Sequence, residues 1–299
     1  MNLNIKMMMF AWVILLGAAG SASAQFDLGS LLKKGIDVAK KTTEASKDIT
    51  EPEEINMGEG IAAVLLGASP LHADTNLQRY VNKVGRWVAT QSSRPDLPWS
   101  FAVIDTPTIN AFALPGGKVF VSIGLLRMLK SESELAGVLA HEIGHVMQRH
   151  QIQAIQASKT SAVYQDALQA EAGERIARSR AGSNALTGTL SNAAASAGIE
   201  LVKNGFFSRP LDRGLEYEAD RVGATLAAKA GYESYGLISA IQMLSTLKQE
   251  ESGVSITMST HPTPTDRLAE LEKFAPTLDK FSSQPLVEER FAKVMAAVK

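Results

Sequence analysis

Residues 131–153 read SESELAGVLAHEIGHVMQRHQIQ, and this stretch decides the fold expected for the chain. Ser131 followed by Glu134 three residues later is the capping-box pattern that opens a helix. The apolar residues behind it recur at helical spacing and supply one buried stripe: Leu135, Val138, Leu139 and Val146. The pattern therefore predicts a helix from Ser131 to about Gln153.

Two histidines, His141 and His145, lie in the middle of this predicted helix. Residues i and i+4 share a helix face, so both imidazoles can point at one ion, while Glu142 lies beside them within reach of a metal-bound water. A surface helix that carries two histidines by chance is the alternative. His150 is turned by about 140° from His145 on a continuous helix, so it is predicted to be an ordinary surface histidine.

A second predicted helix offers the third ligand that such a site needs. Residues 212–220 read DRGLEYEAD, which places Glu216 and Asp220 four residues apart on one face and Glu218 on the other side. One carboxylate would complete a site of two histidines and one carboxylate, and the residue a turn later could accept the second ring N–H of a ligating histidine. A solvated acidic face is the alternative, but the pairing with residues 141–145 favours ligands.

Composition narrows the class of protein further. The chain has 299 residues, 30 Lys and Arg against 31 Asp and Glu, 45% hydrophobic residues and no cysteine. The balanced net charge gives no excess of basic residues of the kind that binds nucleic acid, and the hydrophobic content is too high for a disordered protein. Without cysteine there is no disulfide, thiolate metal site or acylated lipoprotein cysteine, so a metal must be held by histidine and carboxylate.

The first 24 residues are predicted to be a cleavable signal peptide. A positive charge at Lys6 precedes an apolar run over 7–19, and Ala22, Ser23 and Ala24 form a small-residue cleavage site. An uncleaved membrane anchor is the alternative, but the apolar run is shorter than the about 20 residues that cross a bilayer. We therefore expect an exported protein that begins at Gln25 and keeps no transmembrane anchor.

The rest of the chain is expected to form a polar lead-in over 25–60, without a periodic core face, and one domain over 61–299. Pro115, Gly116 and Gly117 separate two short strands and predict a hairpin. Mostly helical segments follow, so the expected class is α+β with a small sheet beside the 131–153 helix. The predicted strands are 100–104, 109–114 and 118–122, and the further helices are 75–91, about 212–229, 235–249, 265–274 and 286–298.

Several motifs together resemble one known family. They are the HExxH motif at 141–145, EYEAD at 216–220, NAFALPGG at 110–117 and the pair His261 and Pro262. In these motifs the chain, over roughly residues 77–271, is similar to the HtpX, Oma1-like and CAAX prenyl peptidase family (metallopeptidase family 48), which are gluzincins with a zincin-like fold. The predicted signal places it nearest the soluble periplasmic members. We expect the chain to depart from two relatives, since no cysteine follows the predicted signal and no tetratricopeptide domain is expected after the peptidase domain.

The resemblance implies a role for each matching residue. His141, His145 and Glu216 would be ligands of one Zn²⁺ per chain, and Glu142 would be the general base. Asp220 would be the neighbouring carboxylate, often labelled a proton donor. In the expected reaction Glu142 takes a proton from the zinc-activated water, which attacks the peptide carbonyl, and returns it to the leaving amine.

The resemblance also brings a later segment to the cleft. His261, held in a proline-rich turn, and Arg267 are candidates to stabilise the oxyanion of the reaction. The family equally permits His261 to occupy the open zinc position and keep the enzyme latent, and a helix-capping or surface histidine is the plain alternative. The sequence does not separate these roles.

Two further segments have expected roles in binding. Asn110, Ala111, Phe112 and Ala113 resemble the gluzincin edge strand, to which an extended substrate would add by main-chain hydrogen bonds. A buried hairpin strand is the alternative. The Ala, Gly and Ser-rich stretch 182–198 lies between the two ligand-bearing helices and is expected to be either a mobile lid or an extra helix pair.

The expected function is a zinc-dependent endopeptidase that hydrolyses unfolded or misassembled cell-envelope proteins in quality control, with a possible link to the outer-membrane assembly machinery. The alternative is a periplasmic chaperone or adaptor for outer-membrane protein assembly, with structural zinc or a latent protease. An intact Glu142 favours the enzyme, because a structural site needs no base. A secreted digestive protease is disfavoured, because no long pro-segment is present.

Overall fold

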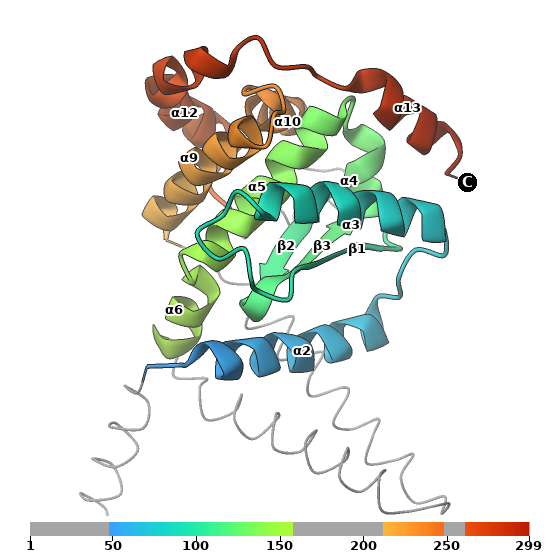
Figure 1. Ribbon diagram of the computed structural model, residues 1–299, viewed down its shortest axis with the longest axis vertical. Helices are drawn as coiled ribbons and strands as arrows, with labels where there is room; N and C mark the ends of the chain where they lie inside the picture. Colours follow the sequence, from blue (N-terminus) through green and yellow to red (C-terminus); the bar gives the residue numbers. More distant parts are fainter. Residues whose placement is uncertain (1–47, 158–211, 248–260, 299) are drawn as a thin grey trace, which may run out of the picture. The chain divides into compact units, whose positions relative to one another are not determined.

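The structure is a computed structural model that describes residues 48–157, 212–247 and 261–298, so the predicted signal peptide 1–24 and the predicted lid 182–198 lie outside the described residues. Helices dominate, and one small sheet accompanies them (Figure 1), which confirms the α+β class. The elements are α2 (Glu51–Ala68), α3 (Thr75–Ala89), β1 (Ser100–Ile104), β2 (Ala111–Leu114), η1 (Pro115–Gly117), β3 (Lys118–Ser122), α4 (Ile123–Met128), α5 (Glu132–Met147), α6 (His150–Ala157), α9 (Arg213–Lys229), α10 (Gly236–Ser245), α12 (Pro264–Leu278), η2 (Asp279–Phe281) and α13 (Glu288–Ala296).

The sheet has three strands in the order β1-β3-β2. β2 and β3 form the predicted antiparallel hairpin, joined by η1, whose Gly116 has a φ of 71° that favours glycine. β1 instead pairs with β3 in parallel. β1 and β3 have their predicted bounds, whereas β2 begins at Ala111 rather than at residue 109.

Side chains on the two faces of the sheet enter different parts of the core, as the alternation of a strand requires. One face packs with α3 and α5, and the other packs with α2 and α6. The first face carries Phe101, Val103, Ala111, Ala113, Val119 and Val121; the second carries Ala102, Ile104, Phe112, Leu114 and Phe120. Helices therefore cover the sheet on both sides (Figure 1).

Helix α2 corrects the expectation of a polar lead-in up to residue 60. Its core face has one apolar residue per turn, at Met57, Ile61 and Leu65, and all three are buried. This face is narrow and its N-terminal part lies among glutamates and glycines, so the segment reads as polar in the sequence. The buried carboxylate of Glu54 is satisfied by Arg94, whose guanidinium donates to both carboxylate oxygens.

The chain also breaks where the sequence predicts a continuous helix to about Gln153. α5 ends at Met147, Arg149 has a φ of 56° in the left-handed region, and α6 starts at His150. That conformation costs a residue other than glycine about 1–2 kcal/mol. The Arg149 side chain helps to hold it, because its Nε donates to Glu54 Oε2 at 3.0 Å and its guanidinium to the Ile49 carbonyl.

Two sets of side-chain hydrogen bonds hold the N-terminus of α5, one at its cap and one at Glu132. Ser131 Oγ accepts the Glu134 N–H as predicted, while the Glu134 carboxylate accepts the N–H of Lys130 rather than that of Ser131. Glu132 is buried and accepts hydrogen bonds from the hydroxyls of Tyr80 and Tyr232. Arg290 of α13 donates two further hydrogen bonds to the Glu132 carboxylate, which connects the C-terminal helix to α5.

The later helices follow the predicted order with small shifts of their bounds. Asp212 caps α9 by accepting the Gly214 N–H, and Thr263 caps α12 by accepting that of Asp266. α12 continues to Leu278, beyond the predicted end at Phe274.

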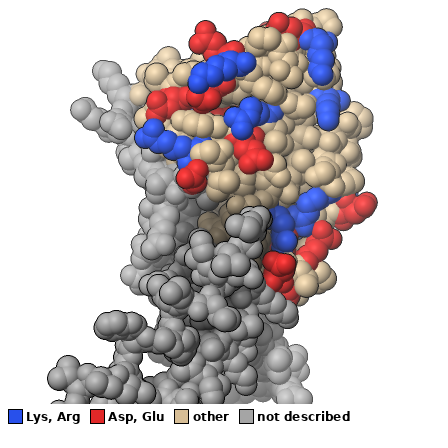
Figure 2. Space-filling model, turned by 90° about the vertical axis from the view of Figure 1, so that its left-hand side faces the viewer, with Lys and Arg blue, Asp and Glu red and all other residues tan. Residues whose placement is uncertain are grey.

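No helix within the described ranges combines the length and the apolar character needed to cross a membrane. On the face shown in Figure 2, basic and acidic side chains are interspersed rather than gathered by sign. This distribution matches the balanced charge of the sequence.

The Glu132 network predicts an acid-dependent stability. Burial alone would raise the pKa of Glu132, but the hydrogen bonds from Arg290, Tyr80 and Tyr232 hold it below the ordinary value of 4.5. The contribution is therefore complete above about pH 5 and is lost as the pH falls through the lowered pKa. We expect Glu132→Gln to lower the free energy of unfolding by about 2 kcal/mol at pH 7, and the difference from wild type to shrink below pH 4.5 in urea titrations.

Glu289→Gln is the matched control, because Glu289 is exposed on the same helix as Arg290. It should change the stability by less than about 0.5 kcal/mol at either pH. An equal loss in the two variants would contradict the role given to the Glu132 network.

Candidate active site

The candidate site lies where α5 and α9 pack along each other, and glycine makes their approach close. A Cβ at Gly223 of α9 would come within 2.7 Å of both the backbone N and the Cα of His141. A Cβ at Gly144 of α5 would lie 3.2 Å from the carbonyl oxygen of Ala219. The two helices can therefore bring short side chains on one helix into direct contact with those on the other.

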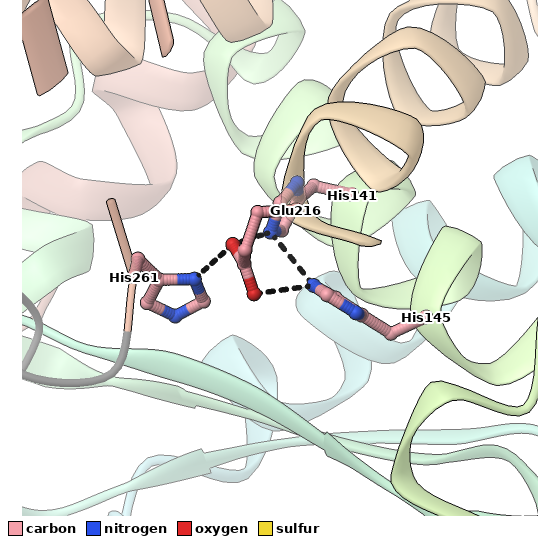
Figure 3. Close-up of side chains that lie close together, drawn as sticks. All are labelled: His141, His145, Glu216 and His261. Atoms are coloured by element: carbon pink, nitrogen blue, oxygen red, sulfur yellow. Dashed lines mark hydrogen bonds and ion pairs between the residues drawn. The ribbon is translucent and has the colours of Figure 1, made fainter. Parts of the chain in front are cut away.

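Three side chains converge from these helices (Figure 3). His141 Nε2 and His145 Nε2 lie 3.1 Å apart. Glu216 Oε2 lies 3.7 Å from His141 Nε2, and Glu216 Oε1 lies 3.5 Å from His145 Nε2. All three side chains are buried, and Glu216 Oε1 has no hydrogen-bond partner within the part of the chain that the structure describes. The structure thus brings together the three residues expected to be metal ligands.

His261 joins this cluster from the turn before α12. Its Nδ1 lies 2.5 Å from Glu216 Oε2, and Figure 3 shows the ring pointing at that carboxylate. One donor atom each from His141, His145, Glu216 and His261 lie within 4.8 Å of one another, which is a grouping that could hold a metal ion. The surface-histidine alternative for His261 does not fit this position.

Asp220 and Arg267 form a buried pair behind His141. Asp220 Oδ1 lies 2.9 Å from His141 Nδ1, on the side of the ring away from Glu216. Arg267 donates to both oxygens of Asp220, from Nε at 2.9 Å and from a terminal nitrogen at 2.5 Å. The Arg267 guanidinium, a candidate to stabilise the oxyanion, is thus engaged with Asp220.

Electrostatics within the cluster separate the charged groups from the neutral ones. Burial alone would raise the pKa of Glu216, but His261 and the other histidines hold it well below its ordinary range. Burial alone would lower the pKa of His261, but Glu216 raises it above its usual value. Burial lowers the pKa of His145 well below its usual value, so this ring is neutral at pH 7.

Glu142 is buried beside the histidine pair, and its environment favours its protonated form. Burial raises the pKa of Glu142, which the positive charges of His141 and His261 partly oppose. A carboxyl group with a raised pKa takes up and gives back a proton more readily near neutral pH than an exposed glutamate. Burial and a raised pKa are features that suit a carboxyl group to acid–base chemistry.

His150 is buried, whereas the sequence pattern predicts a surface residue. It is 1% exposed, and its Nδ1 lies 2.9 Å from Nδ1 of His145. The prediction was wrong because it assumed a continuous helix. The left-handed conformation of Arg149 turns the chain back, and no glycine marks this reversal in the sequence.

The predicted edge strand is present as β2, which borders the described sheet and packs against α5. Ala111 and Ala113 face the core shared with α5, while Phe112 is partly buried and stacks on Phe120. Asn110 precedes the strand, and its N–H donates to Ser122 Oγ. β2 is therefore an edge strand of the described sheet.

The fold and the side-chain set define a class: the helix-borne HExxH metallopeptidases in which a second helix offers the third donor, the gluzincins.

Comparison with known proteins identifies the family within this class. "Peptidase family M48" matches residues 75–275, and the chain therefore belongs to peptidase family M48. The beta-barrel assembly-enhancing protease of Escherichia coli (strain K12) is 32% identical over 230 residues, which are 76% of this chain and 45% of that protein. The mitochondrial metalloendopeptidase OMA1 of Schizosaccharomyces pombe is 32% identical over 197 residues, 66% of this chain and 52% of that protein. The chain spans about half the length of these curated relatives.

The close approach of α5 and α9 generates a prediction at Gly223. An alanine there would meet the backbone of His141, which cannot rotate away, so α9 must move from α5 and carry Glu216 with it. We expect Gly223→Ala to lower the free energy of unfolding by about 1–3 kcal/mol and to weaken divalent-metal binding, measured by urea titration and chelator competition.

Gly67→Ala is the control, because Gly67 lies in helix α2 and nothing approaches its added Cβ within 4 Å. It should leave metal binding unchanged and stabilise the helix slightly. Unchanged metal affinity in Gly223→Ala would contradict the role given to the helix spacing.

Proposed function

We propose that this chain is a zinc-dependent endopeptidase whose metal is held by His141, His145 and Glu216. The observation that carries the proposal is the convergence of these three buried side chains from α5 and α9. Family M48 membership supports it, because the motifs of the sequence fall on these positions.

The spacing of the donors fits a tetrahedral ion. Zinc lies about 2.0–2.2 Å from nitrogen and carboxylate donors, so two ligands of one tetrahedral ion are about 3.3 Å apart. The separations among His141, His145 and Glu216 are 3.1, 3.5 and 3.7 Å, close to that value. Imidazole and carboxylate donors are a set that zinc commonly takes in catalytic sites.

The charge balance also favours a divalent cation. The buried cluster holds the carboxyl groups of Glu142, Glu216 and Asp220 but one guanidinium, that of Arg267. If the histidines bind a metal as neutral rings and all three carboxyl groups ionise, two of the negative charges have no guanidinium to pair with. Unpaired buried charges are costly, and a divalent ion would neutralise both.

The chain's own residues then divide the chemistry. Zinc, when bound, polarises the peptide carbonyl and lowers the pKa of a bound water to near 7. Glu142 accepts a proton from the attacking water and returns it to the leaving amine. Asp220 orients His141 through its Nδ1, and Arg267 holds Asp220 in place.

The edge position of β2 in the described sheet supports extended polypeptide as the substrate. A peptide that adds beside Asn110, Ala111, Phe112 and Ala113 would be held by backbone hydrogen bonds, which select for unfolded rather than folded protein. Together with the predicted signal peptide, this supports an exported, periplasmic protease acting on unfolded or misassembled envelope proteins. Beta-barrel assembly-enhancing proteases among the relatives favour a link to outer-membrane assembly.

His261 has two roles open to it within this proposal. Its ring contacts Glu216 and belongs to the grouping that could hold a metal, which favours a fourth donor that keeps the enzyme latent. A histidine at the same place could instead stabilise the oxyanion of the reaction once it leaves Glu216.

Glu142→Gln tests the proposed function. The variant cannot take up the proton, so cleavage of unfolded casein should fall by about 10²-fold or more, while elemental analysis still finds about one zinc per chain, as in the wild type. Glu272→Gln, an exposed carboxylate on α12, is the control and should cleave like the wild type. Retained cleavage in Glu142→Gln, or a wild type without zinc, would refute the proposed enzyme, and chaperone activity that survives the substitution would favour an adaptor.

His261→Ala distinguishes the two roles of His261. If the ring keeps the enzyme latent, casein cleavage should rise several-fold at equal zinc content, because a position for water is freed. If it stabilises the oxyanion, cleavage should fall by about 10²-fold. Since the ring contacts Glu216, we expect the rise, and a fall would reassign His261 to the reaction itself.

A further inference from the structure

His150 is a buried ionisable group that the proposed mechanism does not use. Its Nδ1 lies 2.9 Å from His145 Nδ1, and the two rings meet edge to face with centroids 5.0 Å apart. Among the described residues, the second nitrogen, Nε2, has no hydrogen-bond partner, and Glu218 Oε2 lies 3.7 Å from it. The hydrogen bond that fixes the ring is therefore the one with His145 Nδ1.

The contact between the rings permits a single arrangement of protons once His145 holds a metal. A metal at Nε2 of His145 takes the lone pair of that nitrogen, so the neutral ring must carry its proton on Nδ1. His145 Nδ1 then donates, and His150 Nδ1 must accept. The proton of His150 consequently lies on Nε2, the side that faces the carboxylate of Glu218.

The backbone is arranged to bring His150 to this place. On a continuous helix the ring would lie well away from His145, and the left-handed conformation of Arg149 brings it back. Arg149 is held by the buried Glu54 of α2, which Arg94 also contacts. A strained residue other than glycine that is fixed by an ion pair with a buried carboxylate marks a position where a particular geometry is maintained.

We propose that His150 is a positioning residue that fixes the ring orientation and tautomer of His145 for metal binding. The inference rests on the proposed function, since it assigns His145 as a ligand. His141 is oriented by the carboxylate of Asp220, whereas His145 is oriented by a neutral imidazole. The outer partner of a ligating histidine commonly changes metal affinity by about 10–100-fold when it is removed.

Nuclear magnetic resonance of the full zinc-loaded chain tests the proton arrangement without any substitution. The sequence holds five histidines, so long-range nitrogen–proton correlations can resolve each ring. We expect His145 to carry its proton on Nδ1 and His150 on Nε2. A His150 ring protonated on Nδ1 would overturn the inference.

Substitutions then test the effect on the metal. His150→Ala removes the acceptor and should weaken zinc binding about 10–100-fold in chelator competition. His150→Asn places an amide oxygen near the position of Nδ1 and should restore the affinity to within a few-fold of the wild type. Ile152→Ala is the matched control, because Ile152 is buried on the same helix and offers no polar group.

The thermal midpoint of the metal-free proteins separates positioning from packing. His150→Ala and Ile152→Ala should both lower it, but only His150→Ala should lose zinc affinity. Three results would overturn the role of His150 and leave the proposed function intact. They are an unchanged zinc affinity in His150→Ala, equal losses of zinc affinity in His150→Ala and His150→Asn, and a loss of zinc affinity in Ile152→Ala that matches the one in His150→Ala at the same drop in thermal midpoint. A wild type that binds no zinc would instead refute the proposed function and the inference with it.

Discussion

Helices α5 and α9 lie so close that the backbone of His141 fills the space a methyl group at Gly223 would take. The rest of the site depends on this contact. Histidine, glutamate and aspartate are short side chains, and they meet across two helices only when the helix axes approach closely. The small residues along the contact, Gly144, Ala219 and Gly223, permit that approach, and the carboxylates of α9 then reach the imidazoles of α5.

Burial of the charged groups at this contact costs the fold free energy, and it also makes the site suitable for chemistry. Charged groups taken out of water must be paired, and each one here has a partner: Asp220 has Arg267, and Glu216 has His261. The same low-dielectric surroundings strengthen the interaction of the cluster with a cation. The packing of α5 on α9 thus creates both the requirement for positive charge and the geometry that receives it.

Much of this arrangement is visible in the sequence, and the exceptions have physical causes. Helical spacing in 131–147 and 212–229 predicts which side chains share a face, because each segment is regular over several turns. The core face of α2 is not predicted, because one apolar residue per turn gives only a weak helical periodicity in the sequence. His150 is misplaced because a left-handed residue other than glycine is stabilised by tertiary contacts, from Glu54 and the Ile49 carbonyl, which no local pattern encodes. The parallel pairing of β1 with β3 likewise depends on tertiary packing rather than on a local sequence pattern.

The donors of the site come from three parts of the chain: α5, α9 and the turn that holds His261. A polypeptide made from its N-terminus has both histidines of α5 before it has any carboxylate of α9. Bringing these distant segments together requires closing long stretches of chain and docking α9 and the turn before α12, so the complete set of donors arises only near the end of folding. The grouping that could hold a metal is therefore incomplete until these last segments have been made and have docked.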